Sequence, residues 1–289
     1  MPPQQLHVFA ARFNPLRWQQ PERHFRDWAA HMLDSGVKLT VVECQYGERS
    51  FICEMPHVNH VAVRADSWAW SKENLLNLGI ARVPHAKYLC FSDTDVFHRR
   101  ASWAAETVEA MQHYRIGQPW SDAYDLGPHD EHIQHHVSFC RQWLHGQPVV
   151  PDGPNWWKFN GGLYDYPHSG YCWFIRREVL DWVGGLIEIA GMGSADHHMA
   201  LTLAGKVERS VPGGTAASYL AVLERWQQRA ALAVNGRIGF VHGTIEHRFH
   251  GRKADRGYLS RWEMFVRHGF DADTDLKRNT FGVIEWAGN

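Results

Sequence analysis

The chain is poor in cysteine and has no long apolar run. Its 289 residues include 5 Cys, an odd number, and no two of them form a Cys-x-x-Cys pair. A disulfide framework or a cysteine-based zinc site is therefore not expected. A stretch of about 18 apolar residues is missing as well, and the first residues do not follow the pattern of a signal peptide. We expect a protein of the reducing cytoplasm that does not insert into a membrane.

An excess of charge of one sign is also missing. The chain has 30 Lys and Arg against 31 Asp and Glu, a net charge of −1 with His counted as neutral. Generic polyanion-binding proteins carry an excess of Lys and Arg, so this balance counts against that function. Histidine and tryptophan are abundant, with 20 and 14 residues. Histidine favours metal or phosphate chemistry and tryptophan suits stacking on sugars or bases, although most of both are expected to serve packing or lie on the surface.

Hydrophobic periodicity predicts alternating strands and helices over the first 115 residues. The expected strands cover 6–13, 37–47 and 86–97, with two shorter extended pieces at 51–56 and 60–65, and the expected helices cover 21–36, 71–82 and 103–114. This alternation is typical of an α/β fold with a mostly parallel, doubly wound sheet and helices on both faces. Ligands of such sheets bind beyond the carboxyl ends of the strands.

Residues 118–168 lack this periodicity and are rich in Pro, Gly, Trp, His and Asp. We predict a long irregular insertion there. The pattern then predicts strands at 170–176 and 237–241, and helices at 178–190, 194–203, 218–232 and 258–268. No linker divides the chain into separate domains.

The segment FSDTDVF places two carboxylates, Asp93 and Asp95, directly after an apolar strand. Mg²⁺ and Mn²⁺ prefer oxygen ligands and are often held by one or two carboxylates together with substrate phosphates. The spacing therefore predicts a divalent cation site that bridges the phosphates of a ligand. Two carboxylates that cap the strand or the next turn are the alternative, and position does not separate the two readings.

The segment HGTIEHRFHG contains His242, His247 and His250. Neutral imidazole is an acceptable ligand for Mn²⁺. A solvated, His-rich loop is the alternative, and the His-Glu-x-x-His spacing of zinc proteases is missing.

Two further segments carry charged groups. In GMGSADHHMA, Asp196 stands at the start of an expected helix, where it is either a general base for a hydroxyl or a stabiliser of the helix N-terminus. The segment HGRKADRGYLSRW contains a basic cluster that either neutralises a diphosphate or lies exposed at a helix start. Its members are Arg252, Lys253, Arg256 and Arg261.

The order of these segments resembles the GT-A glycosyltransferases, in particular the group of the beta-galactosyltransferases and their bacterial or viral relatives. ENLLNLG (73–79) resembles a helix before the Asp-x-Asp strand of that group, and FSDTDVF matches the strand itself. GYCWFIRREVLDWVGGL (170–186) resembles the stretch that ends in Gly-Gly, GSADHHM takes the place of a Gly-Glu-Asp segment, and GTIEHRFHGRK (243–253) resembles the segment with the metal-binding His. The resemblance runs from about residue 6 to residue 262, and the shared order is its specific part.

This resemblance implies one GT-A-like domain over 1–289, with a nucleotide-sugar-binding half (1–117) and an acceptor and catalytic half (118–289). It implies a glycosyltransferase that uses Mn²⁺ or Mg²⁺ to move a sugar from a nucleotide-diphosphate sugar, by default a UDP-sugar, to a carbohydrate or other hydroxyl acceptor with inversion. It gives no oligomeric state.

The resemblance also implies residue roles. Asp95 is the direct metal ligand, His247 a further ligand and His250 the runner-up, while Asp93 lies near the ribose or the water shell of the metal. Asp196 is the base. The implied donor-site residues are Arg12, Phe13, Asn14, Asp66, Lys72, Asp93, Asp95, Arg252 and Lys253, and the acceptor side takes Trp156, Trp157 and Asp196.

The chain departs from the group at Ala195, where an acceptor-binding Glu usually precedes the base. This departure leaves the acceptor undefined, and three alternatives stay open. The first is an enzyme of the same class that acts on a modified base in DNA, which the neutral net charge disfavours. The second is a non-catalytic nucleotide- or sugar-binding protein on the same fold. The third is a metal-dependent hydrolase built from the histidine clusters.

Overall fold

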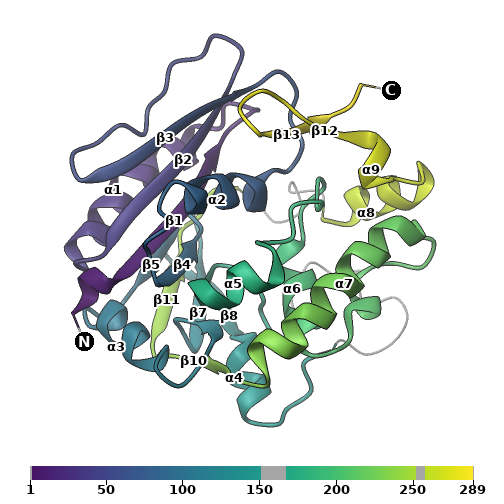
Figure 1. Cartoon of the computed structure of the whole chain (residues 1–289). Helices are drawn as coiled ribbons and strands as arrows, with labels where there is room; N and C mark the ends of the chain where they lie inside the picture. Colours follow the sequence, from purple (N-terminus) through teal and green to yellow (C-terminus); the bar gives the residue numbers. More distant parts are fainter. Residues whose placement is uncertain (1, 151–166, 252–257, 289) are drawn as a thin grey trace.

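A twisted, mostly parallel sheet forms the centre of the molecule. The computed structural model describes residues 2–150, 167–251 and 258–288. Within them the main sheet has seven strands in the order β10-β6-β9-β4-β1-β2-β3 (Figure 1). β3, β2, β1 and β4 run parallel, and β9 is antiparallel to both β4 and β6. The strands are β1 (Leu6–Phe13), β2 (Lys38–Tyr46), β3 (Val58–Ala65), β4 (Tyr88–Ser92), β6 (Ile116–Gln118), β9 (Cys172–Arg176) and β10 (Ile238–Phe240).

Helices cover both faces of this sheet because its strands are apolar on both sides. Val8 of β1 packs with Trp28 and Trp103, which lie on α1 (Gln19–Asp34) and α3 (Trp103–Ala110). The next residue, Phe9, belongs to a second core together with Leu76 of α2 (Lys72–Ala81). The same core takes side chains from α5 (Arg177–Val183), α6 (Ala195–Leu203) and α7 (Ala217–Val234). The predicted α/β fold class is confirmed.

A second, four-stranded sheet lies beside the carboxyl end of β4. Its order is β5-β11-β7-β8, with β5 (Val96–His98), β11 (Thr244–His247), β7 (Asp122–Leu126) and β8 (His132–Val137). Helix α4 (Phe139–Leu144) follows β8. The structure therefore differs from the irregular segment expected over 118–168, because β7 pairs with β11 about 120 residues further along the chain and short-range periodicity does not record such pairing. Residues 151–166 lie outside the described part.

Most predicted elements agree with the structure to within a few residues, and two helices are shorter than predicted. α3 ends at Ala110 and α5 at Val183, where the sequence predicts ends at 114 and 190. Gly184 terminates α5 because its φ of 86° is left-handed, a conformation that glycine adopts without strain.

The last described residues form α8 (Tyr258–Arg267), α9 (Ala272–Asp275) and the antiparallel pair β12 (Leu276–Arg278) and β13 (Ile284–Trp286). Short 3-10 turns occupy Pro3–Gln5 and Val207–Ser210. Among the described helices, none has the length and apolar character needed to cross a membrane.

Candidate metal and substrate site

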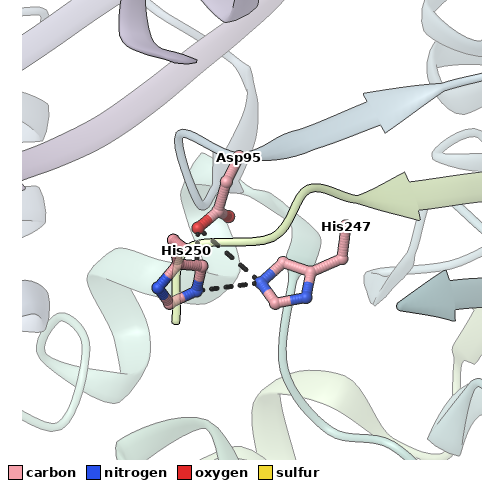
Figure 2. Close-up of side chains that lie close together, drawn as sticks. All are labelled: Asp95, His247 and His250. Carbon is pink, nitrogen blue, oxygen red and sulfur yellow. Dashed lines mark hydrogen bonds and ion pairs between the residues drawn. The ribbon is translucent and has the colours of Figure 1, made fainter. Parts of the chain in front are cut away.

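Three potential metal ligands meet where the two sheets adjoin. Asp95 lies in the turn between β4 and β5, His247 ends β11, and His250 lies in the loop that follows (Figure 2). The antiparallel pairing of β11 with β5 sets His247 opposite Val96, and the backbone N–H of Arg248 donates to the Asp95 carbonyl at 2.9 Å. These pairings bring ligands from distant parts of the sequence together.

The spacing of the three side chains fits one divalent cation. The Nε2 atoms of His247 and His250 are 3.2 Å apart, and Asp95 Oδ2 lies 3.6 and 3.2 Å from them. Ligand atoms at right angles around such an ion lie about 3 Å apart, since each is about 2.1 Å from it. One carboxylate and two imidazoles suit Mn²⁺, and the donor set also suits Zn²⁺ or Fe²⁺.

Asp125, which the sequence did not point out, orients one of these ligands. Parallel pairing of β7 with β11 sets it beside His247, and His247 Nδ1 lies 2.7 Å from Asp125 Oδ1. An ionised carboxylate can only accept, so Nδ1 carries the proton and Nε2 is left to face Asp95. His136 Nε2 and the Tyr171 hydroxyl also donate to Asp125, at 2.8 and 2.6 Å. Burial raises the pKa of Asp125, but the hydrogen bonds from both histidines outweigh it and lower the pKa.

Replacing Asp125 with Asn should weaken Mn²⁺ binding about 10- to 100-fold, the usual effect of losing a carboxylate behind a metal-bound histidine. The amide can donate toward Nδ1 as well as accept from it, so the tautomer of His247 is no longer fixed. Calorimetric titration with Mn²⁺ measures the change. Asp122→Asn is the matched control, because Asp122 lies on the same strand but pairs with Arg141 at 2.6 Å. An unchanged affinity in Asp125→Asn would contradict this role.

The charge of His247 makes stability depend on pH in the metal-free protein. Burial lowers the pKa of His247, but Asp95 and Asp125 outweigh it and raise the pKa to about 10. Because this pKa lies above the unfolded value of 6.5, the stabilisation is fully present below about pH 6.5 and is lost as the pH rises through about 10. The free energy of unfolding should fall by up to about 1.4 kcal/mol per pH unit in that window.

Urea denaturation in EDTA at several pH values measures this loss. His247→Gln should show a flatter profile than the native protein, since the titrating group is gone. Parallel profiles of the two proteins would show that other groups cause the dependence.

A cavity lies beside the three metal ligands, which are not themselves part of its lining. Asp93 and Tyr171 line it, and the ring centroid of Tyr171 lies 4.9 Å from that of His247. Lys72, on the first turn of α2, holds its Nζ 3.3 Å from Asp93 Oδ1. Burial raises the pKa of Asp93, Lys72 lowers it, and repulsion from Asp95 and Asp196 adds to the net increase.

Asp196 lies on the first turn of α6 and lines the same cavity. Its Oδ1 accepts the backbone N–H of His197 at 2.8 Å. The other carboxylate oxygen of Asp196, Oδ2, lies close to the backbone of Gly170. Any larger residue at this position would place its Cβ 2.9 Å from Oδ2. The structure thus brings together six predicted residues: Lys72, Asp93, Asp95, Asp196, His247 and His250.

The predicted donor residues near the end of β1 lie outside the cavity lining. Arg12 is 5% exposed, and within the described residues its Nε and Nη2 have no hydrogen-bond partner. Phe13 packs edge-on against Trp70. Asn14 exchanges hydrogen bonds with the backbone of Trp18 and so closes the turn before α1.

The remaining predicted residues are placed as follows. Asp66 is exposed and does not line the cavity. Arg252, Lys253, Trp156 and Trp157 lie outside the described residues.

The chain resembles solved structures of known proteins, but it has no match by sequence. No protein-family model matches the chain, and no curated protein matches it. The chain is similar to a mutant of Drosophila beta-1,4-galactosyltransferase 7 in complex with manganese, UDP-Gal and xylobiose, at 10% identity and a TM-score of 0.45, over 98% of this chain and 94% of that chain. It is also similar to a UDP-glucose pyrophosphorylase complexed with UDP-glucose, at 11% identity and a TM-score of 0.35, over 91% and 98%. At these values no residue role follows from the likeness.

Proposed function

We propose that this protein is a metal-dependent glycosyltransferase that moves a sugar from a nucleotide-diphosphate sugar to an acceptor hydroxyl. One observation carries the proposal: a group of three metal ligands adjoins a cavity that also holds a lysine–carboxylate pair and a carboxylate on a helix N-terminus. Transfer from a nucleotide sugar needs a site for the diphosphate, a cavity for the sugar and a base for the acceptor. The metal ligands would bind the diphosphate, the cavity would hold the sugar, and the carboxylate on the helix N-terminus would be the base.

Asp95, His247 and His250 would hold the cation, which when bound neutralises charge on the diphosphate leaving group. Lys72 adds a positive charge beside Asp93, at the end of β4 where ligands of parallel sheets bind. These residues favour departure of the diphosphate, and the sugar acquires oxocarbenium character as it leaves.

Asp196 is the proposed base. Its Oδ1 is held by the amide of His197, and Oδ2 takes the proton of the acceptor hydroxyl as that oxygen attacks the anomeric carbon. Attack from the side opposite the leaving group gives inversion at the sugar. UDP is the proposed nucleotide because of the sequence resemblance.

Release of UDP from a panel of UDP-sugars tests the proposal. We expect release that requires Mn²⁺ or Mg²⁺, stops with EDTA and accelerates when an acceptor is present. The acceptor panel includes monosaccharides, glycosides and DNA that carries a hydroxyl-bearing modified base. Binding of a nucleotide sugar without transfer or hydrolysis would favour a non-catalytic binding protein, and the absence of binding to every nucleotide sugar would refute the proposal.

A further inference from the structure

A buried carboxylate, that of Glu73, lines the same cavity as Asp196. It lies on the first turn of α2 next to Lys72, and the residue is 7% exposed. Its Oε1 is 3.6 Å from Lys72 Nζ, which lies closer to Asp93, at 3.3 Å. The proposed mechanism assigns metal binding, departure of the diphosphate and proton removal to other residues. It gives Glu73 no role.

The surroundings of Glu73 make this carboxylate costly to bury. A buried ionised group destabilises the fold unless partners compensate for lost water. Lys72 is shared with Asp93 and so compensates in part. Burial raises the pKa of Glu73, Lys72 lowers it and Asp196 raises it, and together these effects bring the pKa to about 7. Near neutral pH the carboxyl group can therefore accept a hydrogen bond, and in its protonated form it can also donate one.

The remaining walls indicate which ligand this carboxyl group faces. Ala195, the residue before Asp196, contributes a methyl group, so α6 supplies a single carboxylate and α2 supplies the other. Phe91, Trp173 and Met199 give the cavity an apolar side. A pyranose sugar matches such walls, because its hydroxyl groups donate to carboxylates while the C–H face of its ring packs on aromatic side chains.

We propose that Glu73 is a substrate-binding residue that hydrogen-bonds a hydroxyl group of the sugar in this cavity. The inference rests on the proposed function and adds the residue that selects among sugars. The hydroxyl belongs either to the sugar being transferred or to the acceptor, and both present the same chemistry to Glu73. A role limited to pairing with Lys72 is the competing explanation.

Glu73→Gln (E73Q) separates these explanations because it keeps the size of the side chain and removes its charge. With Mn²⁺ present, the affinity of E73Q for UDP should stay within about twofold of the native value. Either its affinity for UDP-sugars or its KM for the acceptor should worsen about 10-fold, the effect of losing one hydrogen bond to a charged group. The first change assigns the hydroxyl to the donor sugar, and the second assigns it to the acceptor.

Glu178→Gln is the matched control, since Glu178 occupies the first turn of another helix, α5, and its side chain is 69% exposed. It should bind all these ligands as the native protein does. If E73Q does not fold, Glu73→Asp, which withdraws the carboxylate by one methylene, should give the same selective loss. Unchanged binding of both sugars, or an equal loss of UDP binding in E73Q, would overturn the proposal.

A native protein that binds no nucleotide sugar would refute the proposed function, and the role of Glu73 would then be tested separately. Ligand-detected NMR with free galactose, glucose and xylose then compares native protein and E73Q. Contact signals that disappear in E73Q support sugar binding by Glu73. Absent signals, or equal signals in both proteins, overturn it.

Discussion

Asp95→Ala should abolish the Mn²⁺-dependent stabilisation of the protein by UDP. Asp95 is the one carboxylate of the group, and its Oδ2 lies within 3.6 Å of both histidine Nε2 atoms. Without it, two neutral imidazoles would face a hard cation that prefers oxygen. In the native protein, ligand at about 100 times its Kd stabilises the fold by about 2.7 kcal/mol, which raises the Tm by about 5–10 °C.

Thermal unfolding with UDP, with and without Mn²⁺, measures this effect in both proteins. The variant should remain folded without metal, because the loss of the attraction to His247 is offset by the loss of the repulsion from Asp93. Asp34→Ala, at an exposed position at the end of α1, is the control and should keep the full shift. If Asp95→Ala shows a metal-dependent Tm shift as large as that of the native protein, Asp95 is not a metal ligand.

Asp196→Asn should lower turnover about 10²- to 10⁴-fold, the usual contribution of a general base. The Asn carbonyl oxygen can still accept the N–H of His197, as Asp196 Oδ1 does at 2.8 Å. The helix start is therefore preserved, and the loss is confined to the group that would take the proton.

Two measurements separate this role from a structural one. The kcat for sugar transfer should fall, while the Kd of UDP with Mn²⁺ stays close to the native value. Asp181→Asn, whose carboxylate is 64% exposed on α5, should retain native turnover. Native turnover in Asp196→Asn would refute the base assignment, and a joint loss of donor binding would indicate a structural effect.

Several features of the site were readable in the sequence. The apolar run of β4 followed by Asp93 and Asp95 predicts carboxylates at the carboxyl end of a parallel strand, and they lie there. Periodicity likewise predicts α6, and with it the place of Asp196 on the first helical turn. The metal, donor and base roles remain predictions that the variants above test.

The sequence by itself determined the alternation of strands and helices, because a segment that buries one face has hydrophobic residues at regular intervals along it. Tertiary structure decided which segments are neighbours. Pairing of β7 with β11 joins Asp125 to His247 across 122 residues, and packing of α2 and α6 around one cavity joins Glu73 to Asp196. No local pattern records these contacts, since hydrogen bonding between strands and packing between helices depend on the whole chain being folded.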